Sequence, residues 1–323
     1  MSKMQPEPVL EDGYLKPVEL VDVFVANVVD KKKTSQIVKE LAMIAPLTDL
    51  QHLKRVRIST DKGGPLQIVL YKKPPIEIHK NNVEASPYVD LHKVISCIDG
   101  IGNIYLVKVP SSPPLTRHQY NEAIKYWPVN FHEDKQISSL LSGKYFTDEE
   151  LKDIERYMKM AVELALIAKR SNQQPIGAVI VDPVNKKVIA EAYDLRQAGY
   201  SLQHAVMVAV DLVAHSQGGG MWQFKDRECG LKYSQHHTSE IINDKNGPYL
   251  CTGYDLFITQ EPCTMCSMAL VHSRIGRVFY GSSHPAGALG THYKIHCQQG
   301  LNHHYKVFKN CLSLETDKLY QCS

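Results

Sequence analysis

The sequence predicts an α/β protein in two parts, and three observations lead to this fold class. The length of 323 residues is enough for roughly two domains. Up to about residue 130 the predicted order is strand, helix, strand, strand, strand, helix, which favours a small α+β domain with a ferredoxin-like arrangement. From residue 147 helices and strands alternate as expected for an α/β/α sandwich around a mixed sheet. We therefore expect domains at residues 1–130 and 147–323, joined by a linker at 131–146.

The elements of the first domain follow from hydrophobic spacing. Between Thr34 and Ile44 the apolar residues recur at helical intervals, which predicts a helix. A second helix is expected between Thr116 and Tyr126, because it follows a Pro-Pro pair and stops before Pro128. Short runs rich in Val, Ile and Leu predict four strands, at residues 18–28, 53–58, 66–71 and 104–109. Residues 131–144 are expected to form a loop.

The second domain begins with a capping box, in which Thr147 is followed three residues later by Glu150. The helix after it carries an apolar stripe, which predicts that it packs on a sheet. A hairpin is expected at 175–193, and a helix after His204. Residues 216–247 are rich in Gly and polar residues without a clean period, so they predict an irregular insertion. A strand, a helix that begins with Cys-x-x-Cys and another strand follow this insertion.

Composition excludes several classes of protein. The net charge of +3 is too small to indicate nucleic-acid binding by itself. The eight cysteines have no regular spacing, which favours a reducing compartment over a disulfide scaffold. No apolar run approaches the length of a membrane span, and the first residues lack the apolar core of a secretion signal. We therefore expect a soluble intracellular protein without a membrane partner.

The most informative motif combines His204 with Cys263 and Cys266. Imidazole nitrogen and thiolate sulfur are ligands that zinc prefers, and a catalytic zinc site typically has three protein ligands. Cysteines three residues apart in the first turn of a helix lie on one face. The spacing and Pro262 before the pair fit the H-x-E…P-C-x-x-C signature of zinc-dependent nucleobase deaminases. The sequence therefore predicts zinc; the alternative is a reduced structural cysteine pair and an ordinary core histidine.

Val206 stands where that signature has its glutamate. The glutamate moves protons between the metal-bound water, the ring and the leaving amine, a contribution of roughly 10²–10⁴-fold in rate. Valine has no ionisable group, so we expect a site that keeps its metal for structure and has no catalytic residue. The alternative is that another carboxylate, Glu261 or Asp194, replaces it.

The first domain also carries short basic clusters. Solvated turns and strand faces account for most such clusters, while a discontinuous patch that contacts RNA phosphates is the alternative. The candidate RNA-binding residues are Lys31, Lys32, Lys33, Lys54, Arg55, Arg57, Lys72 and Lys73.

Residues 147–323 resemble the cytidine and tRNA-adenosine deaminase family. The motifs that carry the resemblance are Pro175–Val181, His204–Val206, Thr259–Cys266, Ala269–Ile275 and Gly287–Gly290. More narrowly, His-Ala-Val after a basic N-terminal extension is similar to the non-catalytic subunit of the eukaryotic tRNA wobble-adenosine deaminase. This resemblance covers nearly the whole chain.

The resemblance implies a cytidine-deaminase-like fold with His204, Cys263 and Cys266 as zinc ligands and Val206 at the catalytic position. Asp194 falls where active relatives place an asparagine that contacts substrate. It also implies a heterodimer with a catalytic subunit that keeps His-Ala-Glu, and tRNA capture by the N-terminal domain. Separately, we expect a location in the nucleus and cytoplasm. Two other functions stay open: a deaminase active by itself through a substitute carboxylate, and a zinc-stabilised RNA-binding scaffold.

A structural zinc usually has four protein ligands, and the fourth is not evident. One hypothesis is that the tail Tyr320–Ser323 folds back and supplies it, through the Cys322 thiolate or the terminal carboxylate. The alternative is a water molecule. The pairs His236-His237 and His303-His304 lack matching partners in the sequence, so we interpret them as surface residues.

Overall fold

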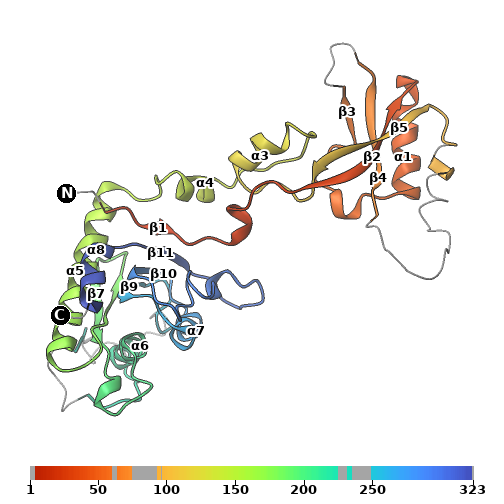
Figure 1. Cartoon of the computed structure of the whole chain (residues 1–323). Coiled ribbons are helices and arrows are strands. Elements are labelled where there is room, and N and C mark those ends of the chain that lie inside the picture. The colour runs from red at the N-terminus through yellow and green to blue at the C-terminus, as the bar shows by residue number, and fades with distance from the viewer. Residues whose placement is uncertain are drawn as a thin grey trace. The chain divides into compact units, whose positions relative to one another are not determined.

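The computed structural model describes residues 4–59, 64–74, 93–95, 97–224, 231–234 and 249–321 (Figure 1). The chain forms two compact units. One consists of residues 12–138, and the other combines residues 1–11 with residues 139–323. Within the described residues, no helix is both long and apolar enough to cross a membrane.

The larger unit is built on a seven-stranded mixed sheet with the order β1-β11-β10-β9-β6-β7-β8. Strands β9, β10 and β11 run parallel, while β6 is antiparallel to β9 and to β7. The strands span Glu7–Pro8 (β1), Gly177–Asp182 (β6), Lys187–Tyr193 (β7), Lys232–Tyr233 (β8), Asp255–Gln260 (β9), Arg277–Ser282 (β10) and Lys306–Lys309 (β11). The predicted mixed sheet is confirmed.

Helices cover this sheet in two pairs. Helix α5 (Asp148–Arg170) lies beside α8 (Ser313–Tyr320), and α6 (Ala205–Ser216) lies beside α7 (Thr264–His272), which gives the expected sandwich (Figure 1). The capping box predicted at Thr147 and Glu150 forms and starts α5. Gly177 lets α5 approach β6 closely, because a side-chain carbon at this position would lie 2.0 Å from the carbonyl oxygen of Ala161. Buried apolar residues of α5 and of the strands form the core.

The first eleven residues belong to this larger unit, whereas the sequence suggested a first domain of residues 1–130. Strand β1 pairs antiparallel with β11, and the Val9 amide donates to the Val307 carbonyl at 2.9 Å. The His296 side chain bonds to the Val9 carbonyl at 2.9 Å, and Lys294 Nζ donates to Leu10. The pairing joins segments about 300 residues apart, a distance over which local sequence patterns carry no information.

The smaller unit holds a four-stranded antiparallel sheet with the order β3-β4-β2-β5. Its strands are Leu20–Val28 (β2), Val56–Ile58 (β3), Leu66–Lys72 (β4) and Ile101–Pro110 (β5). Helix α1 (Thr34–Ile44) packs on one face through Ile37 and Leu41. The other face packs against Trp127 and its neighbours. The arrangement agrees with the expected α+β layer.

Two helices follow this sheet in the chain. Helix α3 (Arg117–Ala123) begins with a capping box formed by Thr116 and Gln119. Helix α4 (Lys135–Leu141) lies where the sequence suggested a loop, so that expectation was wrong. The Asp134 carboxylate accepts hydrogen bonds from the amides of Gln136 and Ile137, which starts the helix.

Candidate metal centre

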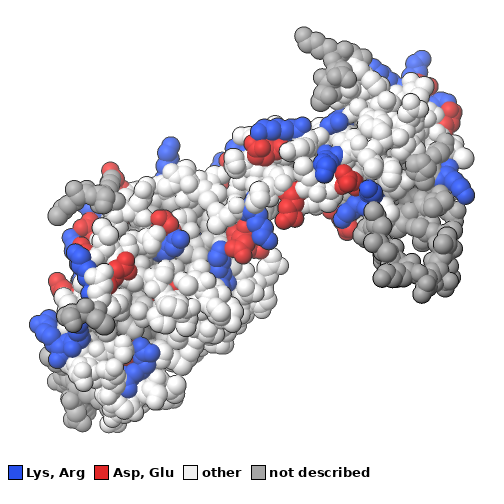
Figure 2. All heavy atoms as spheres, viewed as in Figure 1, with Lys and Arg blue, Asp and Glu red and all other residues white. Residues whose placement is uncertain are grey.

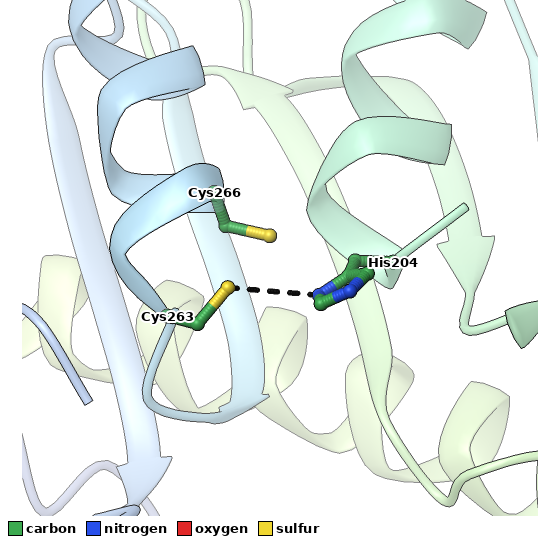
Figure 3. Close-up of side chains that lie close together, drawn as sticks. All are labelled: His204, Cys263 and Cys266. Atoms are coloured by element: carbon green, nitrogen blue, oxygen red, sulfur yellow. Dashed lines mark hydrogen bonds between the residues drawn. The ribbon is translucent and has the colours of Figure 1, made fainter. Parts of the chain in front are cut away.

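The three predicted metal ligands meet at the starts of two neighbouring helices. His204 is the N-cap residue of α6, and Cys263 is the N-cap residue of α7. Cys266 lies one turn into α7, so both sulfurs face the same side (Figure 3). Strand β9 leads into Cys263 through Glu261 and Pro262. The site therefore lies at the carboxyl end of a central parallel strand, where α/β sheets commonly hold their ligands.

The spacing of the donor atoms fits a tetrahedral metal. One ligand atom from each of the three residues lies within 4.8 Å of the others. His204 Nδ1 and Cys263 Sγ are 3.6 Å apart. Zinc bonds of ordinary length at a tetrahedral angle place such a nitrogen and sulfur about 3.6 Å apart. Within the described residues, this is the one group of three or more histidine, cysteine or acidic side chains with metal-ligand spacing.

The two thiols differ in their readiness to ionise. The hydrogen bond from Cys266 lowers the pKa of Cys263 to about 3, and His204 acts in the same direction. The pKa of Cys266 is raised, first by its hydrogen bond to Cys263 and then by burial. The pair therefore holds one thiolate, and the N-terminal end of α7 favours that negative charge. A bound zinc ion would displace the second proton as well.

Val206 lies in the first turn of α6, two residues after His204. Its side chain is buried, with 1% of its surface exposed. An apolar side chain can neither carry a proton nor orient a water molecule. The position that supplies the general acid and base in this motif therefore has no ionisable group in this chain.

Glu261, one candidate for a substitute base, is fully engaged elsewhere. Its buried carboxylate accepts hydrogen bonds from the amides of His284, Leu289 and Thr291 and from the Thr291 hydroxyl. A side-chain carbon on Gly287 would overlap this carboxylate. Glu261 therefore fixes the loop after β10 and has no oxygen free for proton transfer in this geometry. It is also absent from the metal-spaced group among the described residues.

Asp194, the other candidate base, is fully buried beside Arg196. Arg196 Nε donates to both carboxylate oxygens at 2.9 Å, and its amide donates to one of them at 3.1 Å. Both charges act on the Cys266 thiol, so the pair lies close to the metal centre. The sequence drew attention to Asp194 but not to its partner, although the spacing of two residues was visible. Active relatives are expected to have an asparagine at this position. The carboxylate of Asp194 lacks the side-chain amide group of asparagine and is paired with Arg196 instead.

The hypothesis of a fourth ligand from the tail concerns Cys322 and Ser323, which lie outside the described residues. Tyr320 just before them is described: its hydroxyl donates to Thr259 Oγ1 at 3.1 Å on strand β9. His303 and His304 each bond to a backbone carbonyl, of Ile275 and His296 respectively. Both side chains therefore take part in local hydrogen bonds. His236 and His237 lie outside the described residues.

The basic residues of the smaller unit divide into two groups. Arg55 donates to the carbonyls of Leu41 and Ala45, so it caps the end of α1. Arg57 lies over the Trp127 ring, and Lys33 pairs with Asp99. The remaining candidates Lys31, Lys32, Lys54 and Lys72 are exposed, and Lys73 is half-buried.

The exposed lysines do not lie in one place. Lys31–Lys33 follow the end of β2 at Val28, whereas Lys72 pairs with Val23 near the opposite end of that strand. Five residues of strand separate the two ends by about 16 Å. Figure 2 shows Lys and Arg interspersed with Asp and Glu on the visible face, without one continuous basic field among the coloured atoms. The sheet register therefore separates the clusters of the discontinuous patch suggested by the sequence, and contact of these lysines with RNA stays a prediction.

Comparison with known proteins covers nearly the whole chain. Residues 21–127 match the TAD3 N-terminal domain of tRNA-specific adenosine deaminases, and residues 151–282 match the cytidine and deoxycytidylate deaminase zinc-binding region. A protein of Danio rerio named "Probable inactive tRNA-specific adenosine deaminase-like protein 3" is 40% identical over 307 residues, which cover 94% of this chain and 91% of that protein. The chain belongs to the TAD3 family.

Other members of the TAD3 family also match most of the chain. The Homo sapiens protein of that name is 42% identical over 321 residues, covering 95% of this chain and 90% of that protein. The Saccharomyces cerevisiae "tRNA-specific adenosine deaminase subunit TAD3" is 29% identical over 290 residues, with 87% and 80% covered. The resemblance expected from the His-Ala-Val motif is confirmed. His204, Cys263 and Cys266 all fall in the matched zinc-binding region.

Proposed function

We propose that this chain is the non-catalytic, tRNA-binding subunit of a heterodimeric deaminase that converts the wobble adenosine of the anticodon to inosine. The observation that carries the proposal is the group of three metal-spaced ligands of the deaminase motif, beside a buried valine at the proton-transfer position. The names of the relatives support it, because they describe tRNA-specific adenosine deaminase subunits and, in vertebrates, probable inactive proteins.

His204, Cys263 and Cys266 hold zinc in this proposal. When bound, the ion supplies a crosslink between the starts of α6 and α7. These three residues would hold the ion in position, while Glu261 fixes the adjoining loop and the Asp194–Arg196 pair occupies the neighbouring buried space. None of these side chains is free to shuttle protons, so the centre stabilises the fold and does not catalyse the reaction.

Catalysis belongs to a partner subunit that keeps His-Ala-Glu. Hydrolytic deamination replaces the 6-amino group of adenosine with oxygen and releases ammonia. The loop that leads into His204 supports an interface near the metal centre, because Leu202 is 63% exposed and Tyr200 is 43% exposed. Large apolar side chains exposed together mark an interaction surface.

Binding of tRNA falls to the smaller unit. Residues 12–138 contain 17 Lys and Arg against 14 Asp and Glu, so the whole formal net charge of +3 resides there. Cationic side chains attract the phosphate backbone without regard to sequence, and an unpaired anticodon base is accessible at low cost. This division of labour leaves base chemistry to the partner and substrate capture to this chain.

The test is inosine formation on an anticodon-bearing tRNA, measured with this chain alone, with the partner alone and with both. We expect activity only in the mixture. Activity of this chain alone, abolished by Cys263→Ala, would mean that a substitute base exists. Binding of tRNA without any effect on the partner's activity would favour a zinc-stabilised RNA-binding scaffold instead.

A further inference from the structure

Arg57 in the smaller unit has its guanidinium held in a fixed plane. The guanidinium carbon lies 3.9 Å from the centroid of the Trp127 ring, which is fully buried. Arg57 Nε donates to the Gln67 side chain at 2.7 Å, and Nη1 donates to the Tyr126 carbonyl at 2.7 Å. Two hydrogen bonds in the plane and a ring beneath leave little rotational freedom. Arg57 is only half-buried and one guanidinium face lies on Trp127, from which we infer that the opposite face is accessible.

A row of hydrogen-bonded side chains continues from Arg57 across the sheet. The strand register places Arg57 opposite Gln67 and Gln67 opposite Asn27. Tyr105 bonds to Gln67, and its hydroxyl donates to Asn27 at 3.2 Å. All four side chains are partly exposed. The row therefore forms a polar, partly aromatic strip on the same face as Trp127, beyond the apolar core.

Two lysines and a tyrosine flank this strip. Trp127 Nε1 donates to the Lys54 carbonyl at 2.6 Å, which places the exposed Lys54 beside the ring. Tyr126, whose carbonyl binds Arg57, has 41% of its surface exposed, and Lys125 precedes it. We call Arg57, Tyr126, Lys54 and Lys125 the Arg57 platform.

We propose that the Arg57 platform binds an unpaired base of the tRNA, stacked on the outer face of the guanidinium, while Lys54 and Lys125 contact the adjoining phosphates. Unpaired RNA bases stack on guanidinium planes and aromatic rings, and each such contact contributes roughly 1–3 kcal/mol. A surface for phosphates alone needs charge but no fixed plane. The hydrogen bonds that fix the orientation of the planar Arg57 guanidinium therefore distinguish base stacking from simple charge attraction. The inference rests on the proposed function and names the RNA feature that the unit binds.

The experiment compares tRNA affinity and its salt dependence for the full chain in complex with its catalytic partner. Arg57→Lys keeps the charge and removes the plane, so we expect affinity to fall about tenfold with an unchanged salt slope. Lys54→Ala should lower the slope of log affinity against log salt by about 0.7 to 0.9. The matched control is Lys39→Ala. Lys39 is an exposed lysine of α1, on the opposite side of the sheet, so its removal should leave the contribution of base stacking to tRNA affinity unchanged.

Arg57→Lys also removes contacts to Trp127, so Tyr126→Ala serves as a second variant that keeps the backbone carbonyl. Wild-type affinity in both variants would overturn the proposal. Unchanged tRNA affinity with weaker binding of the catalytic partner would overturn it in favour of a protein interface. If inosine formation still required this chain in that case, the proposed function would remain supported. If the partner formed inosine without this chain, the proposed function itself would be wrong.

Discussion

Glu261→Gln tests whether the metal centre is structural, because a structural role and a chemical role of Glu261 predict opposite results for this substitution. The buried carboxylate accepts three backbone hydrogen bonds and one from a hydroxyl. A glutamine amide has one acceptor oxygen, so its NH2 group must face at least one backbone N–H. The Thr291 hydroxyl can rotate to accept, but the His284 amide cannot.

The magnitude follows from that geometry. One charge-assisted hydrogen bond is lost, which costs about 1.5–3 kcal/mol, and the bonds that remain lose their ionic component. We expect the larger unit to be destabilised by about 3 kcal/mol. Urea unfolding followed by zinc release to a colorimetric chelator reports this unit specifically, because the metal ligands lie within it.

The matched control is Glu163→Gln, an exposed glutamate of α5, which should change stability by less than about 0.5 kcal/mol. If Glu261→Gln abolished inosine formation by the heterodimer while costing less than about 1 kcal/mol, the carboxylate would be acting in the reaction. That result would refute the structural assignment of Glu261.

The remaining predictions concern the metal, the Val206 position, a buried histidine and the helix cap. Cys263→Ala should reduce bound zinc, measured by elemental analysis, from one ion per chain to nearly none; retained zinc would contradict the ligand assignment. Val206→Glu should yield no inosine from this chain alone, because Asp194 stays paired with Arg196 and the new carboxylate is buried; turnover would show that only the glutamate was missing. Burial lowers the pKa of His296 from 6.5 to about 4. The unfolded chain therefore binds the proton first, and stability should fall by about 3 kcal/mol as pH drops from 6.5 to 4, with no such loss above 6.5; His296→Gln should remove that component from the urea unfolding curves. Arg55→Met should cost the smaller unit about 2 kcal/mol by removing the side-chain donor to the carbonyls of Leu41 and Ala45 at the end of α1, while the salt slope of tRNA binding stays the same; a lower slope would place Arg55 against phosphate.

Local patterns predicted much of the fold and the metal ligands. The helix at Thr34–Ile44 and the strand at Lys187–Tyr193 have the bounds that hydrophobic spacing indicated. Thr147 began its helix through the expected capping box. These features are determined by residues a few positions apart, so a single sequence contains the information.

Features that depend on contacts between residues far apart in the chain could not be predicted from the sequence. The pairing of β1 with β11 joins the two ends of the chain, and neither two-residue nor four-residue strands carry a periodic signal. Arg55 and Lys54 look equivalent in sequence, yet one caps a helix and the other is exposed. The position of a basic residue in a strand pattern does not predict whether its side chain donates to carbonyl oxygens in the folded chain.

The return of residues 7–8 to strand β11 makes the smaller unit an insertion within the larger one. During synthesis, residues 12–138 can emerge and fold while β1 waits for residues 306–309 to leave the ribosome. The larger unit therefore completes its sheet only when almost the whole chain has been made. In the finished protein, a protease that cuts at one of the two connections leaves the units joined through the other, so the smaller unit stays attached after a single cut.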